Sequence, residues 1–157
     1  MKIECWFTGK TNESYLEQAI GMYVSRINRY LPTRLHIFPD IKASKSESAS
    51  VVKRKEANLQ VTQIQPKDYL VLLDDKGKQF TSLEFASWME QKTVQIPGNL
   101  IFLVGGPYGF DETISAMAKE KISLSKLTFS HQMVRLFLVE QIYRGFAILN
   151  NEPYHHE

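Results

Sequence analysis

Hydrophobic and polar positions in the first part of the chain switch between a period of two residues and the wider spacing of a helix. Apolar and polar side chains alternate over residues 2–8 (KIECWFT), which is typical of a strand. From residue 12 to about residue 31 the apolar positions recur at helical spacing, and Pro32 follows the end of this segment. A short strand over residues 34–38 and a helix over about residues 47–64 repeat the order, with a polar stretch between them.

Two later segments are apolar throughout, residues 69–73 (YLVLL) and 100–104 (LIFLV). Strands of this kind belong to sheets that are covered on both faces. The remaining segments are a helix capped by Thr81 or Ser82, a helix over about residues 111–121, a short irregular stretch over residues 123–129, and a last helix over about residues 132–149. This alternation predicts an α/β fold with a mainly parallel sheet flanked by helices.

Length and composition place these elements in one domain over residues 1–157. Hydrophobic residues make up 43% and charged residues 23% of the chain, which is ordinary for a globular protein. No stretch approaches the roughly 18–20 apolar residues of a membrane span, and the N-terminus does not resemble a signal peptide. The one cysteine, Cys5, allows no intramolecular disulfide and is expected in the core. We therefore expect a cytoplasmic protein without membrane contact.

A pair of glycines ends the second apolar strand, in the stretch IFLVGGPYGF over residues 101–110. Gly105 and Gly106 lack a Cβ that would block a ligand, and ligands usually bind at the carboxyl ends of parallel strands. The spacing matches neither the dinucleotide pattern G-x-G-x-x-G nor a G-K-[ST] phosphate loop. The loop therefore indicates either a pocket for a ligand other than a nucleotide diphosphate or a tight turn into the next helix.

The last helix is apolar nearly all round, so one face is expected to cover the sheet and the other to meet a second partner. This predicts a dimer. Arg135 interrupts the apolar surface, and Glu140 and Arg144 lie four residues apart on one face. The sequence leaves open whether this charged pair is structural or functional.

Two polar stretches also have alternative interpretations. The tail NEPYHHE favours a disordered end by its composition, although Tyr154 could stack on a base and two adjacent histidines follow it. No cluster of thiolates or carboxylates has zinc-ligand spacing, so no metal site is expected. The run Lys53–Arg54–Lys55 is either a solvated helix face or a phosphate contact, and the net charge of +2 permits nucleic-acid binding without indicating it.

Four stretches in order, LVGGPYGF, SLSKLTFSHQMVR, VEQIYRGFAI and the terminal PYHHE, resemble the small SPOUT-class RNA methyltransferases of the ribosomal RNA large subunit methyltransferase H family. The resemblance covers essentially the whole chain. It implies an α/β fold whose C-terminal part forms a trefoil knot, and a homodimer with the cofactor pocket near the interface. It also implies methyl transfer from S-adenosyl-L-methionine to N3 of a pseudouridine in 23S rRNA, with the assembled ribosome as substrate.

The resemblance also implies a set of site residues. By position, the cofactor site would comprise Leu73, Gly105 and the run Leu124, Ser125, Lys126, Leu127, Thr128 and Phe129. The catalytic groups would be Tyr154 and His155 closing over a flipped base, Arg144 oriented by Glu140, and Arg135 holding the phosphate or carbonyl groups of the nucleotide. Two other functions are weighed against this one: a SPOUT methyltransferase acting on tRNA, and a catalytically silent RNA-binding or ribosome-associated protein with the same fold.

Overall fold

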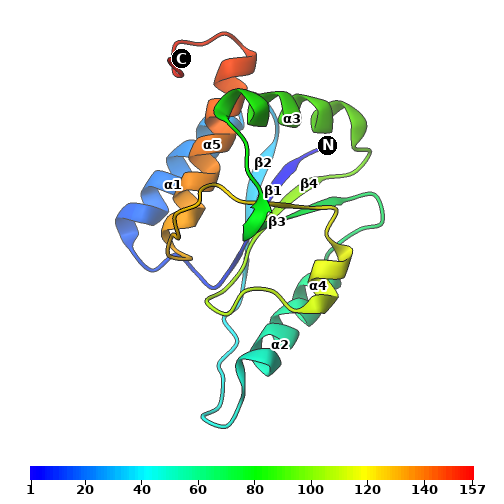
Figure 1. Ribbon diagram of the computed structural model, residues 1–157. Helices are drawn as coiled ribbons and strands as arrows, with labels where there is room; N and C mark the ends of the chain where they lie inside the picture. Colours follow the sequence, from blue (N-terminus) through cyan, green and yellow to red (C-terminus); the bar gives the residue numbers. More distant parts are fainter.

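A five-stranded parallel sheet forms the centre of the protein (Figure 1). The computed structural model describes residues 1–157. The strands lie in the order β2-β1-β4-β3-β5, and every neighbouring pair is parallel. Their bounds are β1 Ile3–Thr8, β2 Thr33–Phe38, β3 Tyr69–Lys78, β4 Leu100–Val104 and β5 Glu120–Ile122. The predicted α/β fold with a mainly parallel sheet is confirmed.

Helices cover both faces of the sheet. On one face lie α1 (Ser14–Ile27), α3 (Ser82–Gln95) and α5 (Met133–Leu149), whose buried side chains share one apolar core with the strands. On the other face lie α2 (Ala49–Val61) and α4 (Glu112–Met117), which contribute to a second, smaller core. No helix is both long and apolar enough to span a membrane.

The two apolar strands supply both cores by simple alternation. Val71 and Phe102 point to the core beneath α1, α3 and α5, whereas Leu72 and Leu103 point to the core beneath α2 and α4. All five residues of β4 are buried. Burial of such a side chain contributes about 1.5–3 kcal/mol, so the continuous apolar runs fix β3 and β4 at the centre of the sheet.

The structure extends β3 beyond the predicted end of its strand. The strand continues through the polar residues after Leu73 to Lys78, and both Leu73 and Lys78 pair with Ile122 of β5. A Cβ on Gly77 would lie 2.5 Å from the main-chain nitrogen of Ile122, so glycine permits this close approach. The pairing of β3 with β5 is thus irregular, with a shift of register between Leu73 and Lys78. The trefoil knot implied by the family resemblance stays a prediction.

The strand β5 replaces the end of a predicted helix. The sequence predicts a helix to about residue 121, but α4 ends at Met117 and Lys119 donates its main-chain N–H to the carbonyl oxygen of Leu70 (2.8 Å). Pairing with β3 satisfies the backbone here, and a three-residue strand is too short to show a period of two. The prediction was therefore wrong over these residues.

Three donors hold Glu120 at this edge of the sheet. Glu120 accepts hydrogen bonds from Tyr69 Oη (2.5 Å), from Trp88 Nε1 (3.0 Å) and from Lys92 Nζ (2.6 Å). Burial raises the pKa of the Glu120 carboxyl, but the hydrogen bonds from Lys92 and Tyr69 outweigh burial and hold the pKa below its ordinary value. Side-chain bonds thus secure a strand that has few residues.

Packing within the chain explains why α5 is apolar nearly all round. The helix lies against the sheet and between α1 and α3 (Figure 1). A Cβ on Gly145 would lie 2.8 Å from Met89 Sδ, which shows how closely α5 and α3 approach. The chain itself covers most of the second face, so the apolar circumference no longer argues for a dimer. The homodimer stays a prediction.

Candidate functional site

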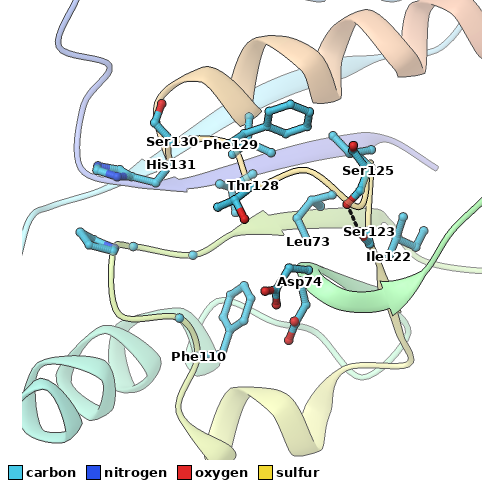
Figure 2. A pocket seen from close by; sticks show the side chains of 18 of the residues that line it. Leu73, Asp74, Phe110, Ile122, Ser123, Ser125, Thr128, Phe129, Ser130 and His131 are labelled. Carbon is cyan, nitrogen blue, oxygen red and sulfur yellow. Dashed lines mark hydrogen bonds between the residues drawn. The ribbon is translucent and has the colours of Figure 1, made fainter.

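A cavity of about 450 Å³ opens at the carboxyl ends of β4 and β5 and beside residues 73–75 in the middle of β3. Leu73, Val104 and Ile122, the last apolar residues of these strands, line it. Figure 2 shows Phe110 and Asp74 on one side of the pocket and Thr128 on the other. The cavity therefore lies where open parallel sheets usually bind ligands.

The glycine loop forms one wall of the pocket. Gly106 and Gly109 form an antiparallel bridge, and Gly109 has a φ of 80°, a conformation that favours glycine. A Cβ on Gly105 would lie 3.0 Å from the ring of Phe110. The bare position at Gly105 therefore lets the Phe110 ring fold over the end of β4, where that ring becomes part of the pocket wall.

A turn between β5 and α5 forms the facing wall. Ser123 Oγ donates to the carbonyl oxygen of Ser125 (2.8 Å; Figure 2), and Leu127 donates its main-chain N–H to Ser125 Oγ (2.9 Å). Ser130 Oγ accepts the main-chain N–H of Met133 (3.0 Å) at the start of α5. Local hydrogen bonds thus hold the segment that looked irregular in the sequence.

The pocket brings together seven of the eight residues expected to bind the cofactor. These are Leu73, Gly105, Leu124, Ser125, Leu127, Thr128 and Phe129, while Lys126 does not line the cavity. The sequence reasoning did not select Asp74, Asp75, Phe110 or His131, which also line it. Asp74 and Asp75 directly follow an apolar strand, and that position was the signal that could have found them.

Four of the five residues predicted to be catalytic meet at the C-terminal end of α5. Glu140 Oε1 accepts hydrogen bonds from Tyr154 Oη (2.9 Å) and from Arg144 Nη2 (2.6 Å). The Arg144 guanidinium lies 4.8 Å from the ring centroid of Tyr154, and its Nη1 lies 3.1 Å from His155 Nδ1. We call these four residues the tail cluster. The tail is packed against the helices, so the prediction of a disordered end from its composition is wrong.

Two tyrosines of the N-terminal part of the chain hold the tail. Tyr23 Oη lies 3.1 Å from Tyr154 Oη, and Tyr30 Oη donates to Glu152 Oε1 (2.5 Å). Because the Tyr154 hydroxyl donates its only hydrogen to Glu140, the Tyr23 hydroxyl is the donor to Tyr154. Burial, followed by the bonds with Tyr23 and Glu140, raises the pKa of Tyr154. Tyr154 is therefore a neutral donor in this arrangement and not a base.

The ring of His155 has a defined tautomer. A guanidinium can only donate, so Nδ1 of His155 accepts from Arg144 and the ring hydrogen is on Nε2. His155 Nε2 is buried without a hydrogen-bond partner and lies 3.4 Å from Glu157 Oε1. The Glu157 carboxylate is therefore within ion-pair distance of this N–H, and the nitrogen has no exposed surface for a ligand in this arrangement.

The structure places Arg135 away from the tail cluster. Its side chain is fully buried and donates to the carbonyl oxygens of Thr8 (2.7 Å), Gly9 (2.8 Å) and His131 (3.2 Å). Burial lowers the pKa of its guanidinium. Arg135 links the end of β1 to the pocket wall, so the expected contact with a nucleotide is not possible in this arrangement. The sequence shows only that Arg135 is a charged residue in an apolar helix, and this does not indicate whether its side chain points into the core or toward a ligand.

The pocket and the tail cluster lie at opposite ends of α5. Val134 lines the pocket, whereas Arg144 belongs to the tail cluster. At a rise of 1.5 Å per residue these positions are about 15 Å apart along the helix. Figure 1 places the C-terminus at the end of α5 that is far from the β5–α5 turn. One chain therefore does not bring both groups of residues to one point.

Comparison with known proteins identifies the family. The family model described as a predicted SPOUT methyltransferase matches residues 1–155. This chain belongs to the SPOUT methyltransferase family. Relatives named ribosomal RNA large subunit methyltransferase H match along their whole length: that of Parabacteroides distasonis is 53% identical over 157 residues, with 100% of both chains covered. That of Cytophaga hutchinsonii is 47% identical over 156 residues, covering 99% of this chain and 100% of the relative.

Family membership confirms that the chain is a methyltransferase and that the fold is the SPOUT α/β fold. The relative from Bacteroides fragilis has the same printed name and is 46% identical over 157 residues. The sequence resemblance is therefore confirmed over the full chain. A methyltransferase needs a methyl donor, and the pocket of about 450 Å³ beside the strand ends is of a size for a small molecule.

Proposed function

We propose that this SPOUT methyltransferase transfers a methyl group from S-adenosyl-L-methionine to N3 of a pseudouridine in 23S rRNA, on the assembled ribosome and as a homodimer. The printed name of the full-length relatives supports large-subunit rRNA as the acceptor. The observation that carries the proposal is the pocket at the ends of β4 and β5 and the middle of β3, which unites seven of the expected cofactor residues.

The pocket suits S-adenosyl-L-methionine in size and chemistry. Its volume of about 450 Å³ lies within the range of small-molecule sites, about 300–1,000 Å³. The strand ends and the 124–129 turn offer apolar contact and main-chain groups to the adenosine part. The carboxylates of Asp74 and Asp75 complement the positive charges of a sulfonium and an ammonium group. The donor would supply an electrophilic methyl group: as the bond to the acceptor nitrogen forms, the sulfonium–methyl bond would break and S-adenosyl-L-homocysteine would leave.

The tail cluster suits the acceptor nucleotide. The Tyr154 ring offers a stacking face for a base that has left its stack. The Arg144 guanidinium offers N–H donors to the carbonyl oxygens of a uracil ring. Negative charge develops on these oxygens when N3 loses its proton, so the same donors stabilise the reacting form. Glu140 holds Arg144 and Tyr154 in position.

A homodimer would bring the pocket of one chain and the tail cluster of the other together. Within one chain, the tail cluster lies at the end of α5 away from the pocket. A second copy that brings its tail cluster to the pocket would complete a site for both donor and acceptor. Two chains related by a two-fold axis can do this reciprocally.

The test is methyl transfer from labelled S-adenosyl-L-methionine to three unmethylated acceptors: assembled ribosomes, free large subunits and bulk tRNA. We expect label mainly in assembled ribosomes, located by mass spectrometry at a pseudouridine of 23S rRNA. Label in tRNA would assign another acceptor to the enzyme. The absence of label from every acceptor, with the donor bound, would favour a silent RNA-binding protein.

A further inference from the structure

We propose that Arg26 of α1 binds a backbone phosphate of the RNA strand that the tail cluster receives. The inference rests on the proposed function, because that function makes the partner an RNA. The sequence pattern does not distinguish Arg26 from the other charged residues of α1. In the structure Arg26 differs from them because it contacts the rings of Tyr23 and Tyr143.

Two aromatic rings hold the Arg26 side chain beside the tail cluster. Its guanidinium carbon lies 5.4 Å from the ring centroid of Tyr23 and 5.5 Å from that of Tyr143. Both rings also contact Tyr154: the Tyr23 hydroxyl lies 3.1 Å from that of Tyr154, and the centroids of Tyr143 and Tyr154 are 4.7 Å apart. Arg26 is therefore one residue removed from Tyr154. Figure 1 shows α1 and α5 side by side.

The guanidinium of Arg26 has no anionic partner in the chain. It makes no salt bridge, in contrast to Arg144 with Glu140 and Arg34 with Glu4. It also makes no hydrogen bond, whereas the buried Arg135 uses its donors on main-chain carbonyl oxygens. Contact with ring faces does not use the five N–H donors of a guanidinium. Arg26 therefore keeps its full capacity for an anion.

Restricted motion distinguishes Arg26 from the other unpaired arginines. Arg29 and Arg54 also lack a salt bridge, but both are exposed and neither has an aromatic ring beneath it. Arg26 is half-buried against Tyr23 and Tyr143. A side chain that is already held loses less conformational entropy when it binds a ligand. Its planar donor array suits the oxygens of a phosphodiester.

The binding of intact protein to assembled ribosomes, measured by co-sedimentation over a series of salt concentrations, tests the proposal. We expect Arg26→Ala to weaken binding about three- to tenfold near 0.1 M salt and to reduce the slope of log K against log salt by about one. Arg26→Lys should restore the slope and only part of the affinity, because lysine keeps the charge without the planar donors. Arg29→Ala, just beyond the C-terminal end of α1 and without the aromatic contacts, is the matched control and should change binding less than twofold.

Three results would overturn the proposal. The first is an unchanged salt slope in Arg26→Ala. The second is a wild-type protein that does not bind ribosomes. The third is a change of oligomeric state in Arg26→Ala by light scattering, which would assign Arg26 to contact with a second copy. Methyl transfer by the wild-type protein is measured in the same samples: ribosome binding without transfer would contradict the proposed function and leave the contact of Arg26 with RNA standing.

Discussion

At the N-terminal end of α5 the pocket is bounded by strand ends and turns, whereas at its C-terminal end Glu140, Arg144 and Tyr154 are joined by side-chain hydrogen bonds. The pocket depends on shape, and the internal bonds of its wall are local ones within the 123–133 turn. The tail cluster depends on a few polar groups from distant parts of the chain. Changes of shape should therefore impair donor binding, and single polar side chains should govern turnover.

Filling the glycine position of the pocket should have the largest effect. In Gly105→Val the new side chain would collide with the Phe110 ring, which already lies 3.0 Å from the position of a Cβ. Overpacking of this kind costs about 1–3 kcal/mol. We expect the affinity for S-adenosyl-L-methionine, measured by calorimetry, to fall about 100-fold.

The control for this change is Gly21→Val on α1. A Cβ on Gly21 would meet no atom within 4 Å, so the same substitution there adds volume in open space. Donor affinity should be unchanged in the control. Equal affinities in Gly105→Val and wild type would show that the glycine does not set the shape of the pocket.

Removing the Tyr154 ring should have the next largest effect, on turnover alone. Loss of a stacking ring costs about 1–3 kcal/mol per base, so we expect Tyr154→Ala to lower kcat about 30-fold. Donor affinity should stay within twofold of wild type, because the proposal assigns the donor to the pocket residues and Tyr154 to the acceptor base. The measurement is methyl transfer to ribosomes at saturating donor, beside calorimetry with donor alone.

Tyr15→Ala is the control for Tyr154→Ala. Tyr15 also belongs to the N-terminal part of the chain that flanks α5, but its side chain is 64% exposed. It should leave both kcat and donor affinity unchanged. A collapse of donor affinity in Tyr154→Ala would contradict the division of labour between the two ends of α5.

A change at Glu120 should lower the stability of the fold without acting on the pocket or the tail cluster in particular. Glu120→Gln removes the charge that accepts from Tyr69, Trp88 and Lys92. Hydrogen bonds to charged groups contribute about 1.5–3 kcal/mol, and partial exposure places the loss at the lower end. We expect a loss of about 1.5 kcal/mol in the free energy of unfolding, measured in denaturant, with kcat unchanged. The exposed Glu90, changed to Gln, is the control.

The same carboxyl predicts a pH dependence. The pKa of Glu120 is lower in the folded protein than its ordinary value, so the unfolded chain takes up the proton first as pH falls. The stabilisation is complete above the unfolded-state pKa of about 4.3 and is lost as pH falls through the folded-state pKa. The difference in unfolding free energy between wild type and Glu120→Gln should therefore shrink below about pH 4. A constant difference across this range would contradict the assignment.

Much of the fold could be predicted because its signals are local. The continuous apolar runs of β3 and β4 indicated a covered parallel sheet, and this is what the structure has. The extension of β3 to Lys78 and the short β5 could not be found, because their pairing depends on a distant segment and their residues are polar or few. Long-range pairing of this kind leaves no period in the sequence.

The sequence predicted the candidate site unevenly for a similar reason. Seven of the eight residues that family resemblance selected for the cofactor line the pocket, and the tail residues that it selected do meet. Arg135 was assigned to a nucleotide, but its donors are used on Thr8 and Gly9. The helical pattern gives spacing along α5 and not the contacts made across the core. Tyr23 and Arg26 were missed because only the packing of α1 on α5 brings them to the tail.

The smallest effect is expected from Tyr30→Phe, which loosens the tail without dismantling it. The change removes the hydrogen bond from Tyr30 to Glu152 and keeps the ring stacked on Phe146 at a centroid distance of 5.3 Å. We expect a loss of about 1 kcal/mol, seen as faster hydrogen exchange of the tail amides. Burial and then the bond to Glu152 raise the pKa of Tyr30 to about 12.

The sign of the accompanying pH effect follows from that shift. The folded-state pKa of Tyr30 lies above the unfolded value of about 10, so its stabilisation is complete below pH 10 and is lost as pH rises toward 12. Tyr30→Phe should lack this loss, and the exposed Tyr15, changed to Phe, should retain it. Unfolding free energies at pH 9 and pH 11 measure the difference. An identical drop in Tyr30→Phe and wild type would mean that Tyr30 does not anchor the tail, and that the tail cluster is held by Glu140 and Tyr23 alone.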